Sequence, residues 1–349
     1  MAGRPPGSGG RLMDAAQVLL AVMWAGLTLY ALLGGADFGG GIWDLLAGRT
    51  REGMPQRRLI EHTIGPVWEA NHVWLIFVLV LLWTGFPPVF AAVMSTLYIP
   101  LTLAAFGIIA RGAAFAFRKS STELWQQRLF GGGFALASVV TPFFLGAVAG
   151  AVASGRVPPG LARGALVGSW VNPSSLLGGV LAVVVCAYLA AVYLCDDAAR
   201  SGVPGLADLF RRRALAAAVA TGAVALLGVA VLRWDAPRLF TGLTHRALPL
   251  VLASALLGVA SLALLWWRRY LLVRVTAVLA VTAVMWGWPV AQYPFMLPPR
   301  VPYQEAAAHP AVLHTVLAVA VVAAVLVLPS IALLFAVQRR LPYTEDASH

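Results

Sequence analysis

Charged residues are scarce in this chain. Asp, Glu, Lys and Arg together make up 11% of the 349 residues, whereas hydrophobic residues make up 60% and the mean hydropathy is +0.83. Soluble globular domains carry about 25% charged residues, so the composition excludes that class. The chain is predicted to be an integral membrane protein.

Cysteine is almost absent, since Cys186 and Cys195 are the only two. On one helix they would lie roughly 13 Å apart, too far for a disulfide between them. No cysteine spacing typical of a metal site occurs, and no metal ligands are expected. The two residues do not indicate a redox compartment.

Acidic residues are fewer than basic ones, 14 against 25, and the formal net charge is +11. The Arg residues are scattered over short loops, with no basic domain that could hold a duplex, so nucleic acid is not an expected partner. We interpret the charge as a sign of membrane topology and of contact with anionic lipid.

Long apolar runs recur along the sequence, and each can supply the roughly 20 residues that a helix needs to cross a bilayer. They are too long and too uniformly apolar for barrel strands, so an all-α polytopic fold is predicted. Four spans followed by four more would suit two bundles, although no convincing internal sequence repeat is visible. Nine spans are predicted near residues 14–36, 66–86, 88–115, 131–152, 173–195, 214–232, 247–267, 271–291 and 311–336.

These spans define a single integral membrane domain over residues 1–349, with a disordered tail at 1–12 and a cytoplasmic tail at 338–349. With nine spans, 17 of the 25 Lys and Arg residues fall on one side of the membrane and 8 on the other. Loops rich in Lys and Arg face the cytoplasm, so the N-terminus is predicted outside and the C-terminus inside. Asp37, Glu61 and Glu69 then lie toward the cytoplasmic half.

Asp37 is an ionisable residue at membrane depth. It ends the predicted first span, within the segment GGADFGGG at 34–41. A carboxylate at the centre of a membrane helix costs roughly 2.5–3.5 kcal/mol, so it requires a partner, a water path or a cofactor. The surrounding glycines allow a neighbouring helix to approach closely and bury the carboxylate. An acid at an interfacial helix end is the alternative.

A second polar group lies at the start of the second span. Glu69 and His72 are three residues apart, hence neighbours on one helix face, where a carboxylate and an imidazole can share or pass a proton. A proton relay that includes Asn71 is one interpretation. The other is a polar helix start, with Trp68 and Trp74 near the lipid headgroups.

His72 is also a candidate axial ligand for a haem, with His314 in the last span as a second ligand. No residue pattern fixes such a pair, so we favour a histidine that is bound to a carboxylate.

Arg111 and Arg118 are seven residues apart and share a face near the cytoplasmic end of the third span. Both side chains can extend to the headgroups. Alternatively, Arg111 pairs with Asp37 or Glu69, which would lower the cost of burying both charges.

Several motifs together resemble subunit II of the cytochrome bd-type quinol oxidases, in the same order and over nearly the full length. The most specific is the second-span block GPVWEANHVWLI at 65–76. The others are GADFG at 35–39, FP at 86–87, ARGAAFAFR at 110–118, NP at 172–173, GW at 287–288 and AQYP at 291–294. The chain is identified as a divergent member of that family.

The resemblance implies a heterodimer in the bacterial cytoplasmic membrane. The partner, subunit I, would carry the haems, of the b and d types, and the quinol site, and would reduce O2 to water. This chain would form two four-helix bundles plus one helix, support subunit I and carry no haem of its own. It would also hold a structural quinone or lipid, and the presence of a small third subunit stays open.

The resemblance also implies roles for single residues. Acids of two family motifs match Asp37 and Glu69, and a cytoplasmic proton path is expected to include Asp37, Glu69, Asn71 and His72. Structural or interface roles are predicted for Trp68, Trp74, Arg111 and Arg118. No residue of this chain is expected to be directly catalytic.

Three positions depart from the family pattern. Gly34 stands where an acid is common, Glu69 where Asp is expected, and Ala116 where Glu is frequent. Glu69 keeps the charge on a side chain that is longer by one methylene. The departures leave the exact proton route open, and the sequence does not distinguish ubiquinol from menaquinol.

Two other functions would use the same residues. A proton-coupled transporter would be favoured by short, broken helix pairs in corresponding halves, and the sequence does not reveal such pairs. A purely structural assembly subunit would use the polar groups only to hold helices together. Neutralising Glu69 would then abolish assembly rather than turnover.

Overall fold

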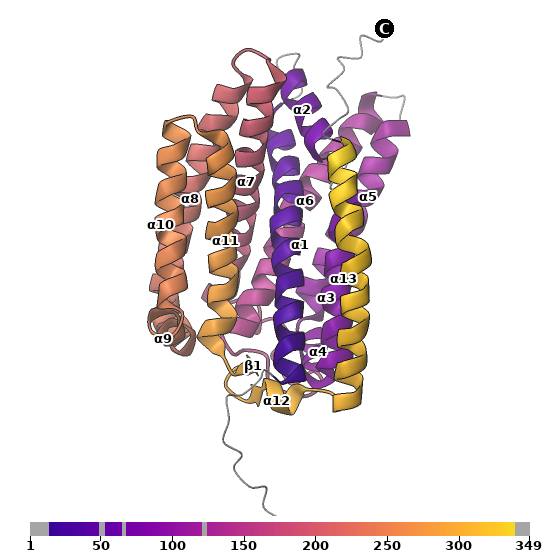
Figure 1. Ribbon diagram of the computed structural model, residues 1–349, viewed down its shortest axis with the longest axis vertical. Coiled ribbons are helices and arrows are strands. Elements are labelled where there is room, and N and C mark those ends of the chain that lie inside the picture. The colour runs from indigo at the N-terminus through magenta and orange to yellow at the C-terminus, as the bar shows by residue number, and fades with distance from the viewer. Residues whose placement is uncertain (1–13, 49–52, 65–67, 121–123, 339–349) are drawn as a thin grey trace, which may run out of the picture.

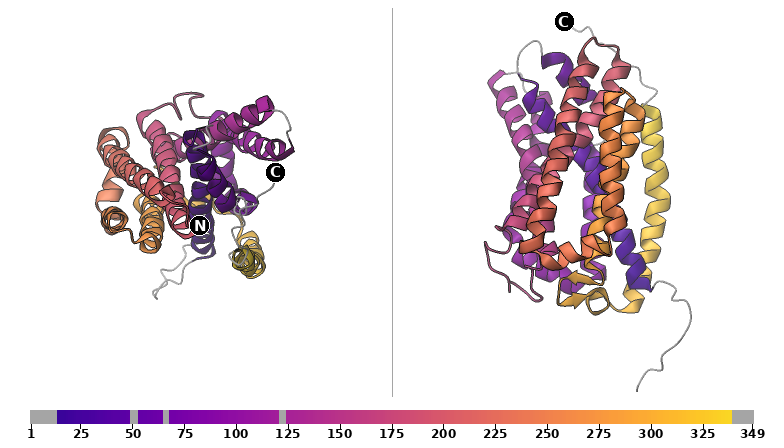
Figure 2. Two further views of the ribbon diagram at one scale, coloured as in Figure 1. Left: turned by 90° about the horizontal axis from the view of Figure 1, so that it is seen from above. Right: turned by 90° about the vertical axis from the view of Figure 1, so that its left-hand side faces the viewer.

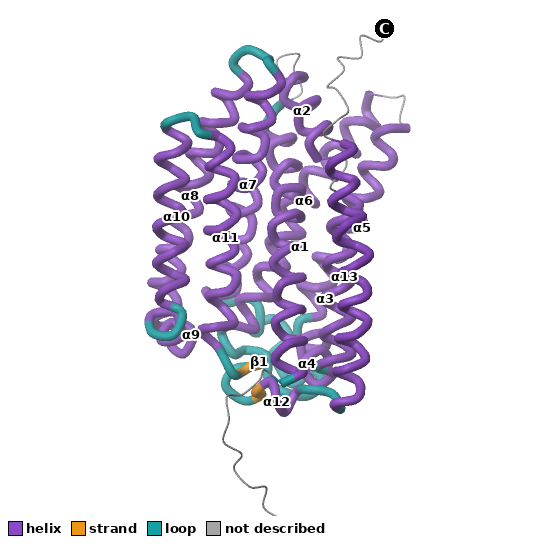
Figure 3. Tube along the Cα trace, in the orientation of Figure 1, coloured by secondary structure: helices purple, strands orange, loops and turns teal. Residues whose placement is uncertain are grey.

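The computed structural model describes residues 14–48, 53–64, 68–120 and 124–338, most of which are helical (Figures 1 and 3). The predicted tails at 1–12 and 338–349 lie outside the described residues, except for Gln338, which ends the last helix. The elements are α1 (Ala15–Leu46), α2 (Met54–Ile64), α3 (Trp68–Gly85), α4 (Pro87–Thr96), α5 (Tyr98–Ser120), α6 (Leu124–Ala153), α7 (Pro173–Ser201), α8 (Leu206–Asp235), α9 (Pro237–Thr244), α10 (Leu248–Trp266), α11 (Tyr270–Gln292), β1 (Phe295–Leu297), β2 (Val301–Pro302), α12 (Tyr303–Ala306) and α13 (Pro310–Gln338).

Among the described residues, seven helices are long and apolar enough to cross a membrane. An eighth span results if α3 and α4, which are joined by a sharp bend, are counted together, and α5 contributes a shorter apolar stretch at Tyr98–Ala114. The predicted all-α polytopic class is therefore confirmed. The predicted number of nine spans is not established by helix length and composition.

Helix α1 is longer than predicted. Asp14 caps it, since its side chain accepts a hydrogen bond from the Gln17 amide while the Gln17 side chain accepts one from the Asp14 amide. The helix then continues through the glycine-rich segment to Leu46, so the expectation that Asp37 ends the first span is wrong. The glycines do not break α1 because it packs against other helices along that segment.

The predicted third span at 88–115 is two helices. Phe86 has φ −137° and ψ 60°, outside the helical region, and Pro87 begins α4 without a backbone donor. The chain turns by 119° between α3 and α4, and a second interruption at Leu97 separates α4 from α5. Helix α4 lies at the end of the bundle that also holds α9 and α12, here called the lower end, opposite α2 at the upper end (Figure 1).

The same break occurs in the second half of the chain. Ala236 has φ −141° and ψ 62°, nearly the values of Phe86, and Pro237 begins the short helix α9. Both α4 and α9 connect one long helix to the next at the lower end (Figure 1). The structure thus contains corresponding broken pairs that the sequence did not reveal. Because they lie at the bundle end and not at midplane, they do not form the discontinuous-helix site of a transporter.

The long helices form two groups of four. Helices α7, α8, α10 and α11 pack together, and α1, α3, α5 and α6 form the other group. Helix α7 joins the groups, since α1 and α6 both pack against it. Helix α13 contacts α1 and α3 and stands at the edge of the assembly (Figure 2). This arrangement agrees with the expected two bundles plus one helix.

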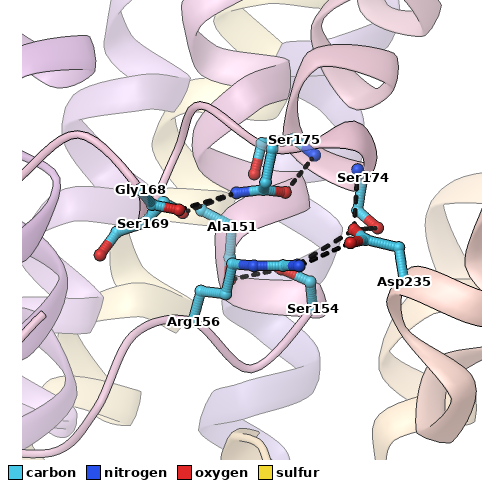
Figure 4. A network of polar contacts seen from close by, with 9 residues as sticks. Ala151, Ser154, Arg156, Gly168, Ser169, Ser174, Ser175 and Asp235 are labelled. Carbon is cyan, nitrogen blue, oxygen red and sulfur yellow. Dashed lines mark hydrogen bonds and ion pairs between the residues drawn. The ribbon is translucent and has the colours of Figure 1, made fainter. Parts of the chain in front are cut away.

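A network of polar contacts at the lower end connects α6, α7 and α8 (Figure 4). Asp235, the last residue of α8, accepts hydrogen bonds from the Ser174 amide at 3.0 Å and the Ser174 hydroxyl at 2.5 Å. Arg156, which follows α6, pairs with the same carboxylate through Nη2 at 2.6 Å and Nη1 at 3.1 Å. Asn172 caps α7 by accepting from the Ser175 amide at 3.0 Å. The carboxylate therefore neutralises both an arginine and the N-terminus of a helix.

Replacing Asp235 by asparagine is expected to destabilise the folded chain by about 1–3 kcal/mol, because the charge-assisted bonds to Arg156 and Ser174 are weakened in a mostly buried position. The measurement is the midpoint of thermal unfolding of the purified protein in one detergent. Asp208→Asn is the matched control, since Asp208 is 43% exposed where it pairs with Arg211 and Arg268, and its loss should cost at most about 1 kcal/mol. Equal shifts for both variants would contradict this prediction.

Candidate functional site

The most buried charges among the described residues are Asp37 on α1 and Arg111 on α5. Their side chains are 1% and 2% exposed. Arg111 binds both carboxylate oxygens, with Nη1 on Oδ2 and Nη2 on Oδ1 at 2.7 Å, and Nη2 also donates to the Asp37 carbonyl oxygen at 2.9 Å. Of the two partners predicted for Arg111, the structure places Asp37 against it. The arrangement is a two-point arginine–carboxylate pair inside the bundle.

The remaining guanidinium nitrogen of Arg111 is also bound. Its Nε donates to the Ser138 hydroxyl on α6 at 3.0 Å, and that hydroxyl donates to the Phe134 carbonyl at 2.7 Å. The guanidinium carbon lies 4.8 Å from the ring centroid of Phe38 and 4.6 Å from that of Phe134. Polar and aromatic contacts therefore surround the arginine, which lowers the cost of its burial.

The glycines around Asp37 make this burial possible. A Cβ on Gly39 would overlap the Cys186 carbonyl oxygen of α7 and lie 2.6 Å from the Ala190 Cβ. A Cβ on Gly41 would overlap the Ser138 hydroxyl of α6. The predicted close approach of neighbouring helices is therefore observed at these two positions. Asp37 is held between three helices and not at an interface with solvent.

An apolar cluster covers the pair on the α3 side. It contains Tyr30, Phe38, Trp74 and Cys186, all buried. Trp74 is 8% exposed and packs edge-on to Phe77, so its side chain is buried within the chain. The cause is its position on the helix face that packs against α1. Trp74 is thus part of the cover of the ion pair.

The other predicted site residues are only partly placed. Helix α3 begins at Trp68 and includes the backbone of the second-span block. The side chains of the remaining predicted residues lie outside the described ones, so the relay geometry and the second arginine stay predictions. These residues are Trp68, Glu69, Asn71, His72 and Arg118.

The geometry of the Asp37–Arg111 pair determines which chemical role it can have. Both carboxylate oxygens of Asp37 are engaged by Arg111 in a buried position. No group of three or more potential metal ligands occurs within the described part of the chain. His62, His245, His309 and His314 are exposed. The binding of both Asp37 oxygens by Arg111 suits the pair to a role as a fixed structural charge.

Several residues of this site were missed by sequence reasoning. Ser138, Phe134 and Cys186 contact the pair or its segment from α6 and α7, far away in sequence. A run of glycines on one helix indicates that a neighbouring helix approaches closely, but it does not identify the residues of that neighbour. A serine or cysteine within an apolar span carries no separate signal.

A second group of charges lies at the upper end. Arg274 of α11 binds Asp196 of α7 at 2.6 Å, and Arg200 binds the same carboxylate at 3.0 Å. Arg274 also lies over the Tyr193 ring, 4.7 Å from its centroid. These side chains are more exposed than the Asp37–Arg111 pair. The group connects α7 to α11.

Comparison with known proteins identifies the family of this chain. The model of the family described as cytochrome bd terminal oxidase subunit II matches residues 15–338. The chain belongs to that family. The buried Asp37–Arg111 pair is accordingly a feature of a cytochrome bd subunit II, and the resemblance seen in the sequence is confirmed.

Relatives show how far this subunit II chain has diverged. It is 31% identical over 176 residues to subunit 2 of the cytochrome bd ubiquinol oxidase of Bacillus subtilis, covering 50% of each chain. It is 29% identical over 188 residues to the cytochrome bd-I ubiquinol oxidase subunit 2 of Escherichia coli K12, covering 51% of this chain and 48% of the relative. The chain thus matches about half the length of these curated relatives.

The fold of this subunit II chain is known from a solved complex. A chain in the structure of bd oxidase from Geobacillus thermodenitrificans superposes with a TM-score of 0.80. The match covers 93% of this chain and 98% of that one at 22% identity. The similarity therefore shows a shared fold over nearly the full length.

Proposed function

We propose that the chain acts as subunit II of a membrane-bound quinol oxidase complex, in which electrons from quinol reduce O2 to water. The observation that carries this proposal is the family match over residues 15–338. The relatives named as ubiquinol oxidase subunits support the substrate class. We assign the b- and d-type haems and the quinol site to a partner subunit I.

The contribution of this chain is to support the partner and to supply protons. Its described residues provide a helix bundle with a paired interior charge. The protons consumed when O2 becomes water must cross part of the membrane, which requires polar groups at that depth. We propose that Glu69, His72 and Asn71 on α3 begin such a path.

The backbone of α3 supports this placement. Trp74 lies in the same cluster as Phe38, next to the ion pair, and Glu69 precedes it by five residues, about 7.5 Å of helix. The start of α3 follows α2, at the upper end (Figure 1). Glu69 would therefore stand between that end and the level of Asp37. Asp37 itself would supply a fixed negative charge beside the path and not a moving proton.

The orientation belongs to the same proposal. We assign the upper end to the cytoplasm, because it holds the arginines of α2 and those that flank the α7–α8 and α10–α11 connections. The N-terminus would then lie outside and the C-terminus inside. A proton path that starts at the upper end would draw protons from the cytoplasm.

Affinity purification of the chain from its native membrane, with a reduced-minus-oxidised absorption spectrum, tests the complex. We expect a stoichiometric second membrane protein and the bands of b- and d-type haems. A colourless protein without a membrane partner would overturn the proposal. A structural quinone and a small third subunit would be identified in the same preparation by mass spectrometry.

Replacing Glu69 by glutamine is expected to slow O2 consumption by the purified complex roughly tenfold or more, because the amide cannot accept and release a proton. The haem spectrum should not change. Glu69→Asp should retain most activity, since it keeps the carboxylate. Glu305→Gln, an exposed acid at the lower end, is the control. Unchanged turnover would refute the relay, and loss of assembled complex would assign Glu69 a structural role.

A further inference from the structure

A cavity of about 300 Å³ lies at the lower end, between α9, the end of α11 and the segment that follows it. Helix α9 forms one wall because Gly242 lets its backbone approach α11, where a Cβ would overlap the Ala291 carbonyl oxygen. Gln292, Tyr293 and Phe295 form the opposite wall. The cavity is separate from the Asp37–Arg111 pair, which lies nearer the upper end.

Three basic side chains line this cavity: Arg238, His245 and Arg246. Arg246 is held in place because its Nη1 donates to the Tyr293 carbonyl oxygen. The His245 ring is fixed through Nδ1, which lies 3.0 Å from the Thr241 carbonyl oxygen. All three side chains are exposed, so their remaining donors are available to a ligand.

Among the described residues, no acid neutralises the two arginines. The lining contains no Asp or Glu, and no salt bridge found in the described ranges of the chain engages Arg238 or Arg246. Asp235 is close in sequence but is bound by Arg156 and Ser174. The cavity is therefore electropositive, and an anion is the ligand that its charge favours.

The surface next to the cavity indicates which kind of molecule carries such an anion. Helix α10 begins at Leu248, two residues after Arg246, and one of its faces exposes Leu248, Leu252, Leu256 and Val259. This apolar strip is about 16 Å long, close to half of the roughly 30 Å hydrocarbon core. Trp234, 65% exposed at the lower end of α8, is typical of the headgroup level.

We propose that this cavity binds the phosphodiester headgroup of an anionic phospholipid. Arg238 and Arg246 would donate to the phosphate oxygens, as guanidinium groups commonly do, with His245 beside them. One acyl chain would lie along the exposed strip of α10. The inference goes beyond the oxidase function and does not depend on it.

The test uses the complex purified with the full-length chain, stripped of lipid in detergent and examined by native mass spectrometry. Phosphatidylglycerol, phosphatidylcholine and inorganic phosphate are titrated separately against the wild type and the double variant Arg238→Gln/Arg246→Gln. The control is Arg163→Gln/Arg300→Gln, which removes the same charge at the lower end outside the cavity.

We expect the wild type and the control to bind one phosphatidylglycerol at least roughly tenfold more tightly than the cavity variant does, which is about 1.4 kcal/mol. Phosphatidylglycerol should also raise the thermal unfolding midpoint of the wild type more than phosphatidylcholine does, a result that needs no variant. Equal binding by the cavity and control variants would overturn the proposal. Displacement of the lipid by inorganic phosphate would assign the site to the free ion and overturn the lipid assignment.

Discussion

Replacing Arg111 by methionine is expected to cost about 3–5 kcal/mol of stability, because it leaves the Asp37 carboxylate buried without its counter-charge. The loss should appear as little or no assembled complex in the membrane and as a large fall in the thermal unfolding midpoint of what is recovered. Arg111→Lys should be less severe, since it keeps the charge but loses the two-point geometry and the Ser138 contact.

The double variant Asp37→Leu/Arg111→Met is the control for this prediction. It removes both charges, so we expect it to recover most of the stability that the single variant loses. Recovery of assembly without recovery of O2 consumption would show that the fixed charge also serves turnover. A double variant as unstable as Arg111→Met would contradict the view that the unpaired carboxylate causes the damage.

Replacing Gly39 by alanine is expected to cost about 3 kcal/mol or more, at the upper end of the range for overpacking. The new methyl group would overlap the Cys186 carbonyl oxygen and lie 2.6 Å from the Ala190 Cβ, so α1 and α7 would have to separate. Backbone atoms cannot move aside as the end of a long side chain can. The measurement is again the thermal unfolding midpoint and the yield of assembled complex.

Gly34 offers the matched control on the same helix. The nearest atom to a Cβ there is Tyr30 Cε2 at 3.4 Å, an ordinary contact. Gly34→Ala should therefore be neutral, or stabilising by up to about 1 kcal/mol because alanine favours a helix. If Gly34→Ala were as harmful as Gly39→Ala, helix contact at Gly39 would not be the cause.

The sequence predicted the class of fold and the character of the site because both depend on local patterns. Long apolar runs require helices, and an acid between glycines indicates that a partner lies close by. That reasoning identified Asp37 and gave its pairing with Arg111 as one of the alternatives. It did not find Ser138 or Cys186, because contacts between helices depend on how distant segments dock.

The interruption at Leu97 was missed for a related reason, whereas the boundary between the spans predicted at 66–86 and 88–115 coincides with the break at Phe86. Leu97 lies within a nearly continuous apolar run, and hydropathy does not distinguish a helix that crosses the membrane from one that lies along its end. Pro87 and Pro237 begin the two corresponding short helices, α4 and α9. Only the shared backbone conformation of Phe86 and Ala236 shows that the two halves turn in the same way.

The separation of Asp37 from Arg111 in sequence has a consequence for synthesis. They are 74 residues apart, so at about 5–20 residues per second the acid leaves the ribosome about 4–15 s before its partner. During that interval the Asp37 side chain lacks its counter-charge, so its burial in lipid stays costly until α5 arrives. The first bundle can therefore close around the ion pair only after most of its helices have been inserted.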